Sequence, residues 1–142
     1  RLREITGESV QLYRREGTTR ICVAALEPPA GLRDTVPVGT HLPMTAGSGA
    51  KILLAYSDAA TQQAVLPTAK FTDRALAEVR KRGWAQSVAE REPSVSAPVR
   101  DGRGQVVAAV SVSGPIDRIG RRPGARWAAD LLAAADALTR RL

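Results

Sequence analysis

The chain has 142 residues, of which 44% are hydrophobic, and its formal net charge is +7. This length and apolar content suffice for one core, so residues 1–142 are predicted to fold as one domain. Apolar runs fall short of the ~20 residues of a membrane span, and the charged N-terminus lacks the apolar segment of a signal peptide. The sequence therefore predicts a cytoplasmic protein with no membrane partner.

Cysteine and histidine occur once each, as Cys22 and His41. One thiol forms no internal disulfide, and one thiol with one imidazole cannot supply the common zinc sites. Cys22 lies in an apolar run and is expected as an inert core thiol, and His41 has no evident catalytic partner. We therefore predict no metal, no cofactor and no catalytic residue.

The positive charge is spread along the chain in small groups, at 14–15, 80–82, 121–122 and 140–141. Aromatic residues make up only 4% of the chain and do not interleave with these groups, so the pattern of a base-stacking surface is missing. This distribution favours a solvated basic surface over direct, specific nucleic-acid binding. Such a surface could still attract DNA phosphates toward a neighbouring DNA-binding domain.

The first half of the chain alternates strand and helix patterns. These predict, in order, strands at 9–15, 19–26 and 32–38, a helix at 49–57 and a short helix after Asp58. A tight turn at 16–18 joins the first two strands as a hairpin. Ser48 is expected to cap the first helix.

The second half predicts a helix at 73–82, strands at 84–90, 94–100 and 105–113, and a helix at 124–140. Thr72 and Gly83 mark the ends of the first of these helices. The buried stripe of the last helix comprises Trp127, Leu131, Ala135, Leu138 and Leu142. Because short hairpin turns require antiparallel pairing, we predict an α+β fold with an antiparallel sheet flanked by helices.

The strand at 105–113 carries hydroxyls where a strand buried on both faces would be apolar. Side chains alternate along a strand, so Ser111 and Ser113 share a face with Ala109. A turn centred on residues 102–103 places Ser94 opposite Ser111, with Ser96 opposite Ala109. The hydroxyls of Ser94, Ser96, Ser111 and Ser113 are thus expected on one face.

Four hydroxyls among small side chains suit a pocket for a small polar metabolite such as a carboxylate or oxo acid. The alternative is that these serines satisfy one another or nearby backbone in an ordinary sheet.

The glycine-rich segment 45–51 opens the helix at 49–57. Free backbone N–H groups at such a helix start bind anions readily, although the P-loop spacing is absent. The alternative is a tight turn and a cap. Met44, just before it, could pack over a pocket mouth or into the core.

Several segments match a known family in the right order, at 2–12, 32–39, 43–55, 79–84 and 106–115. The most specific are Val-Ser-Val-Ser-Gly-Pro at 110–115 and Leu-Arg-Glu-Ile-Thr-Gly-Glu at 2–8. On these motifs the chain resembles the C-terminal effector-binding domain of IclR-type bacterial transcription regulators.

The resemblance implies a GAF/profilin-like antiparallel sheet flanked by helices, with a ligand pocket on its concave face. It also implies a preceding winged helix-turn-helix domain that binds DNA, and assembly as a homodimer or homotetramer. The ligand-binding positions that carry over are Ser48, Gly49, Leu32, Asp34, Ser87, Ser94, Ser111 and Ser113, to which Met44 is added as a lining residue.

The chain departs from the family pattern at several of these positions. Thr45 replaces the usual histidine, Ala50 a glycine, Ser87 an acidic residue and Ser94 a cysteine. These changes imply a different effector, for which an amino acid or keto acid is one hypothesis. The family also has about three more residues before Ser94. Either the loop is short here or residues are absent, and we predict a break between Pro93 and Ser94 that would mark a lid.

The predicted function is therefore ligand sensing in an IclR-type DNA-binding transcription regulator. A small-molecule effector would modulate operator binding allosterically through the N-terminal segment 1–6. One alternative is a dimerisation module with a filled, dry pocket. The other is a serine-dependent hydrolase, which would lack a general base and any Gly-x-Ser-x-Gly or Ser-x-x-Lys motif.

Overall fold

The structure, a computed structural model, describes residues 2–26, 36–88, 93–120 and 122–140. Within these ranges six strands form one antiparallel sheet in the order β3-β2-β1-β6-β5-β4. The strands are β1 (Ser9–Glu16), β2 (Thr19–Leu26), β3 (His41–Pro43), β4 (Ala85–Ser87), β5 (Ser94–Arg100) and β6 (Val106–Ser113). The predicted α+β class with an antiparallel sheet is confirmed.

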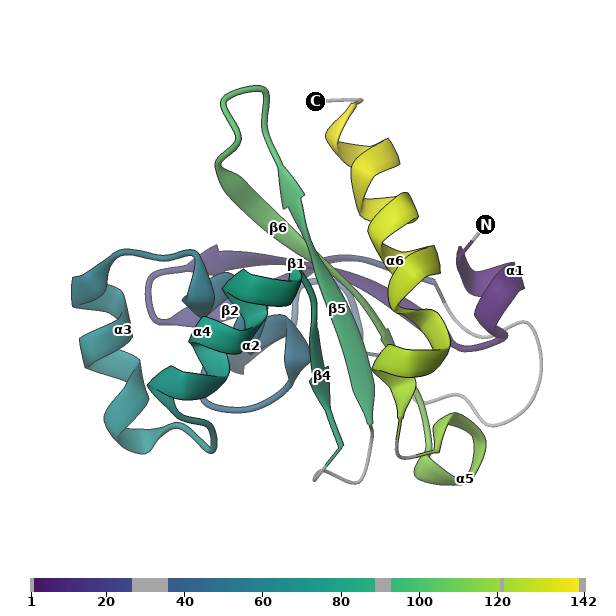
Figure 1. Cartoon of the computed structure of the whole chain (residues 1–142), viewed down its shortest axis with the longest axis horizontal. Helices are drawn as coiled ribbons and strands as arrows, with labels where there is room; N and C mark the ends of the chain where they lie inside the picture. Colours follow the sequence, from purple (N-terminus) through teal and green to yellow (C-terminus); the bar gives the residue numbers. More distant parts are fainter. Residues whose placement is uncertain (1, 27–35, 89–92, 121, 141–142) are drawn as a thin grey trace.

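Helices cover both faces of this sheet (Figure 1). They are α1 (Leu2–Thr6), α2 (Ser48–Ala55), α3 (Ala59–Val65), the 3₁₀ helix η1 (Leu66–Thr68), α4 (Asp73–Arg82), α5 (Ile116–Ile119) and α6 (Pro123–Thr139). One core cluster joins α2 and α4 to Tyr13, Cys22 and Ala109 of the sheet. The other joins α6 to the valines of β5 and β6. Strand alternation therefore feeds two separate cores from the same strands.

Two helix starts follow the sequence prediction. The Asp58 carboxylate accepts the Thr61 N–H at 2.7 Å at the start of α3, and the Thr72 hydroxyl accepts the Ala75 N–H at 3.3 Å at the start of α4. Gly83 ends α4 with a φ of +87°, in the left-handed region that suits glycine.

The prediction that Ser48 caps α2 is wrong. Gly47 occupies the cap position with a φ of +96°, and no side chain of the described residues caps this helix. Ser48 is the first helical residue instead, and its hydroxyl bonds to the sheet. The Ser48 hydroxyl therefore links α2 to β5 rather than capping its own helix.

Two predicted strands are shorter or displaced. Of the strand expected at 32–38, residues 32–35 lie outside the described residues, and 36–38 lead into a turn at Gly39. The Cys22 carbonyl accepts the Gly39 N–H and the Cys22 N–H donates to Thr40, so the chain bends here and pairs only later, as β3. Likewise the strand expected at 84–90 is β4, three residues long; 89 and 90 lie outside the described residues.

The predicted register between β5 and β6 is wrong by two residues. Ser94 lies opposite Ser113, and Ser96 lies opposite Ser111. The connection is longer than expected because the Asp101 carboxylate accepts N–H groups of both Arg103 and Gln105, and a bulge follows Val99. A shift of two residues keeps every side chain on its face, so the predicted grouping of the four serines is confirmed.

Two further sequence predictions concern the two ends of the β5–β6 pair. Pro93 is buried, its carbonyl accepts the Gly114 N–H, and the chain continues directly into Ser94, so the predicted break is wrong. Toward the start of β6, Val107 is 37% exposed, so this strand is buried on both sides only from Ala108 onward.

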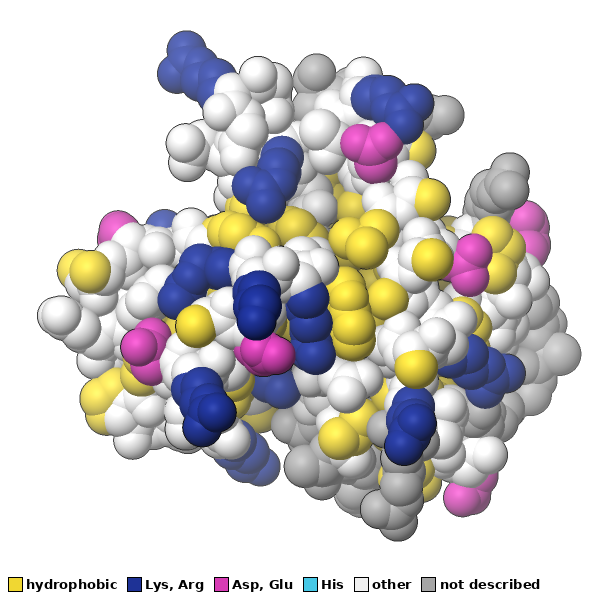
Figure 2. Space-filling view, in the orientation of Figure 1, with side chains coloured by type: hydrophobic (Ala, Val, Ile, Leu, Met, Phe, Trp, Pro, Cys, Tyr) yellow, Lys and Arg dark blue, Asp and Glu magenta, His cyan; other side chains and the backbone are white. Residues whose placement is uncertain are grey.

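The surface agrees with the dispersed charge pattern. Figure 2 shows Lys and Arg side chains spread over the visible face, with Asp and Glu among them and hydrophobic side chains between them. Among the described residues no helix is long and apolar enough to cross a membrane.

Candidate ligand pocket

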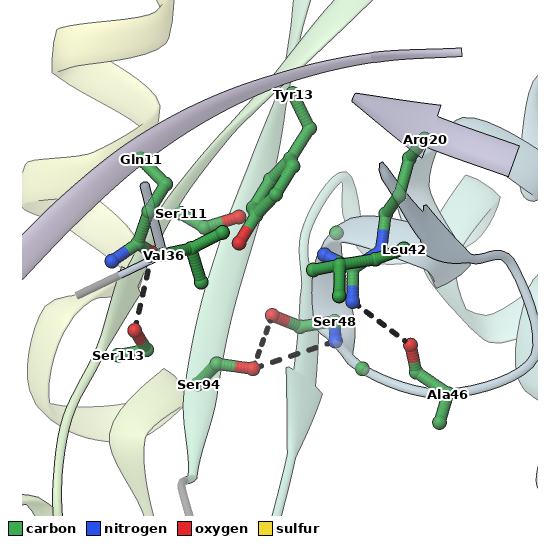
Figure 3. A pocket seen from close by; sticks show the side chains of 12 residues that line it. Gln11, Tyr13, Arg20, Val36, Leu42, Ala46, Ser48, Ser94, Ser111 and Ser113 are labelled. Atoms are coloured by element: carbon green, nitrogen blue, oxygen red, sulfur yellow. Dashed lines mark hydrogen bonds between the residues drawn. The ribbon is translucent and has the colours of Figure 1, made fainter. Parts of the chain in front are cut away.

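A cavity of about 280 Å³ lies between the sheet and the start of α2 (Figure 3). This volume is equivalent to roughly nine water molecules in the liquid at ~30 Å³ each, enough for a small metabolite. Its lining comprises Gln11, Tyr13, Arg20, Val36, Leu42, Ala46, Gly47, Ser48, Gly49, Ser94, Ser111 and Ser113.

Four serine hydroxyls join into a chain of hydrogen bonds at the base of this pocket. The Ser48 Oγ lies 2.7 Å from the Ser94 Oγ and 2.6 Å from the Ser96 Oγ. The Ser96 Oγ lies 2.5 Å from the Ser111 Oγ. The Ser48 N–H also donates to the Ser94 Oγ at 3.4 Å. The serines thus bond to one another, as one alternative predicts, and three of them also line the cavity.

Two glycines let α2 approach the sheet closely. A Cβ on Gly49 would lie 3.2 Å from the Ser111 Oγ and 3.2 Å from Cδ2 of Tyr13. A Cβ on Gly47 would lie 2.9 Å from an Arg20 guanidinium nitrogen, at a backbone φ that favours glycine. The glycine-rich segment therefore serves packing as well as the turn.

Gln11 supplies a buried polar group that its surroundings leave half satisfied. Its side-chain oxygen accepts the Ser113 hydroxyl at 3.1 Å. Its Nε2 is buried and has no hydrogen-bond partner among the described residues. An unpaired buried donor costs about 1–3 kcal/mol.

Arg20 places a positive charge at the pocket. Its guanidinium carbon lies 4.4 Å from the ring centroid of Tyr13, and one of its terminal nitrogens donates to the Ala46 carbonyl at 3.3 Å. Burial raises the pKa of the Tyr13 phenol, and the Arg20 charge opposes this rise only in part. Among the described residues, the pocket lining contains Arg20 and no Asp or Glu, so its electrostatics favour an anion.

The structure brings together five of the nine predicted site residues, namely Ser48, Gly49, Ser94, Ser111 and Ser113. Ser87 is buried on β4 opposite Ser94 but is not among the lining residues. Met44 is fully buried in the core with Ile52 and Leu54, so the mouth position proposed for it is wrong. Its unbranched apolar side chain fills space between α2 and the sheet instead.

Leu32 and Asp34 lie outside the described residues.

Sequence reasoning missed the contribution of the first hairpin. Gln11 and Tyr13 share one face of β1, which pairs with β6 so that Gln11 lies opposite Ser111. A polar residue between the apolar Val10 and Leu12 was the available signal. It could not be used without knowing that the first and last strands are neighbours.

The fold defines the class of protein as an α+β domain with a six-stranded antiparallel sheet between two helical layers. The family model described as "Bacterial transcriptional regulator IclR C-terminal" matches residues 1–140. The chain belongs to that family.

Named relatives are transcriptional regulators. The chain is 30% identical over 135 residues to the HTH-type transcriptional regulator BhcR of Paracoccus denitrificans, with 84% of this chain and 48% of that protein covered. It is 27% identical to the HTH-type transcriptional repressor AllR of Escherichia coli K12, with 84% and 50% covered. The chain therefore spans about half the length of the curated relatives it matches.

Solved structures agree with this assignment. An IclR-family transcriptional regulator from a Rhodococcus species superposes with a TM-score of 0.86 at 29% identity, covering 98% of this chain and 58% of that one. The C-terminal domain of a transcriptional regulator from Vibrio cholerae gives a TM-score of 0.83 at 28% identity, covering 96% and 89%.

Proposed function

We propose that this chain is the effector-sensing domain of a transcription regulator and that its ligand is a small carboxylate-bearing metabolite, such as an amino acid or keto acid. The observation that carries the proposal is a cavity of about 280 Å³ whose lining combines Arg20, three serines of the hydrogen-bonded chain and Gln11, whose buried Nε2 is unpaired among the described residues. A charge and a buried donor are poor choices for a space meant to stay empty. The same cavity argues against a filled, dry dimerisation module.

The alternative of a serine hydrolase lacks support in the geometry. A serine nucleophile needs a base within hydrogen-bond reach. His41 is exposed on β3 and is not a lining residue of the pocket. The described pocket serines bond to one another and to Gln11 instead. A non-enzymatic regulator therefore fits the site better.

The full-length protein would bind DNA through a winged helix-turn-helix domain preceding residue 1 and would assemble as a homodimer or homotetramer. Half of each relative's length lies outside the matched region, and the relatives named above are HTH-type regulators. An effector changes operator binding only if it binds two arrangements of the assembly with different affinity. The link in this chain would be α1, which contacts α6 and β1.

Calorimetric titration of the chain with small carboxylates tests the proposal. Ser111→Leu should abolish binding, because the longer side chain fills the cavity beside Gly49. Val107→Leu is the matched control, since Val107 lies on the same strand but is partly exposed and outside the pocket. Circular dichroism should show both variants folded. Normal binding by folded Ser111→Leu, or failure of all carboxylates with the parent chain, would contradict the proposal.

A further inference from the structure

The serine chain has two ends, and both open into the pocket. Its order is Ser94, Ser48, Ser96, Ser111, with successive Oγ separations of 2.7, 2.6 and 2.5 Å. Ser48 and Ser96 are at most 1% exposed. Ser94 and Ser111 line the cavity at the two ends of the chain (Figure 3).

Counting protons shows what the ends of this chain can offer. Four hydroxyls carry four protons, and the three bonds between them use three. When each hydroxyl donates toward Ser111, the Ser111 O–H is left for the pocket and Ser94 presents a lone pair. When each donates toward Ser94, the Ser94 O–H is left and Ser111 presents only lone pairs. The chain therefore offers one donor and can move it between its ends.

The hydrogen bonds of these serines permit either direction. The only other bond drawn to the chain within the described residues is the Ser48 N–H donating to the Ser94 Oγ. An oxygen has two lone pairs, so Ser94 can accept this N–H together with the Ser48 hydroxyl and still donate its own proton. It can equally accept the N–H while donating to Ser48.

Two other polar groups at the pocket can only donate. The Gln11 amide nitrogen is a donor by its chemistry, and the amide oxygen already accepts the Ser113 hydroxyl. The Arg20 guanidinium carries donors and no acceptor. A carboxylate oxygen is the matching partner for both. The pocket thus joins a fixed set of donors to a reversible hydroxyl chain.

We infer that the pocket accepts both oxidation states of one ligand skeleton, binding 2-oxo and 2-hydroxy carboxylates with similar affinity. This inference rests on the proposed function. The carboxylate lies toward Arg20, and the neighbouring oxygen meets the serine chain. When the serine chain points its free O–H at the ligand, the carbonyl oxygen of a 2-oxo acid accepts it. When the serine chain is reversed and presents a lone pair instead, the hydroxyl of a 2-hydroxy acid donates to that lone pair.

The test is calorimetric titration of the protein with three probes of equal carbon number: pyruvate, lactate and propionate. Pyruvate and lactate should bind within about tenfold of each other, and propionate, which lacks the second oxygen, at least about tenfold more weakly than both. A preference above 100-fold for pyruvate or lactate would overturn the inference while leaving the carboxylate pocket intact. Binding of none of the three would overturn the inference together with the proposed function.

A variant that fixes the direction of the chain sharpens the test. In Ser94→Asp the carboxylate only accepts, so Ser48 must donate to it and Ser111 must present lone pairs. The ratio of lactate to pyruvate affinity should rise at least tenfold, even though the added negative charge weakens both. Ser94→Ala, which leaves the other three serines reversible, should keep the parent ratio. An unchanged ratio of lactate to pyruvate affinity in folded Ser94→Asp would also overturn the inference. If Ser94→Asp binds neither probe, the affinities of the parent protein for pyruvate and lactate decide the test.

Discussion

The two faces of the β5–β6 pair contribute differently to this molecule, one through buried apolar side chains and the other through polar side chains beside a cavity. On the α6 side, Val95 lies opposite Val112 and both are fully buried. On the α2 side, the adjacent pairs are Ser94 with Ser113 and Ser96 with Ser111. The first face therefore supplies hydrophobic stability, at about 1.5–3 kcal/mol for each valine buried. The second face gives up that stabilisation in exchange for polar groups beside a cavity.

The largest effect should come from the α6 side. Leu131→Ala removes a fully buried side chain from the core under α6 and should lower the free energy of unfolding by about 2–5 kcal/mol. Chemical denaturation measures this change. Leu132→Ala, one residue along and 37% exposed, should change it by less than about 1 kcal/mol. Equal losses in the two variants would mean that α6 does not pack as described.

On the α2 side the comparison predicts a change in affinity instead. Arg20→Gln should weaken carboxylate binding about 10- to 100-fold, because hydrogen bonds to a charged group contribute about 1.5–3 kcal/mol. Arg20→Lys keeps the charge, though not the planar fork, and should lose less. Titration at two ionic strengths checks the cause, since binding by the parent should weaken with salt more than binding by Arg20→Gln. Unchanged affinity in Arg20→Gln would remove Arg20 from the site.

The comparison also explains how far sequence reasoning reached. Alternation along β6 predicted the serine face, and this survived a two-residue error in register because such an error keeps the face. The cap at Thr72 and the helix start after Asp58 were predicted correctly because the hydrogen-bond partners at both starts are only three residues away. Gln11 was missed because its role depends on β1 lying beside β6, a contact about 100 residues apart in the chain. Arg20 was missed because its position at the pocket depends on the distant segment that carries Ala46. Hydrogen bonds between residues close in the sequence could be predicted, whereas the pairing of strands far apart in the sequence could not.

Loss of a helix cap that lies outside both faces of the β5–β6 pair should have a smaller effect on stability. Thr72→Ala removes the hydroxyl that accepts the Ala75 N–H at the start of α4 and should cost about 1 kcal/mol of folding free energy. Carboxylate affinity should not change, because Thr72 is exposed and is not among the residues that line the pocket. Thr18→Ala, in the exposed turn between β1 and β2, is the control for loss of a surface hydroxyl. A loss of affinity in Thr72→Ala would show that α4 and the pocket are coupled.

The smallest expected effect is on the pH dependence of stability. Burial raises the pKa of the Tyr13 phenol above its ordinary value of 10. The folded state then holds the phenol proton more tightly than the unfolded chain, so this contribution to stability is complete below pH 10 and is lost as the pH rises through the folded pKa. Denaturation from pH 9 to 11 should therefore show a steeper loss for the parent than for Tyr13→Phe. Parallel curves would contradict the raised pKa.

The sheet ends on both sides in a three-residue strand, β3 at one border and β4 at the other. Longer unpaired borders invite strand addition from another molecule and lead to aggregates or fibrils. Such truncated borders leave only a few main-chain groups available for that kind of templating. Any contact made at these borders would then rely on side chains, whose shape and charge allow selection among partners.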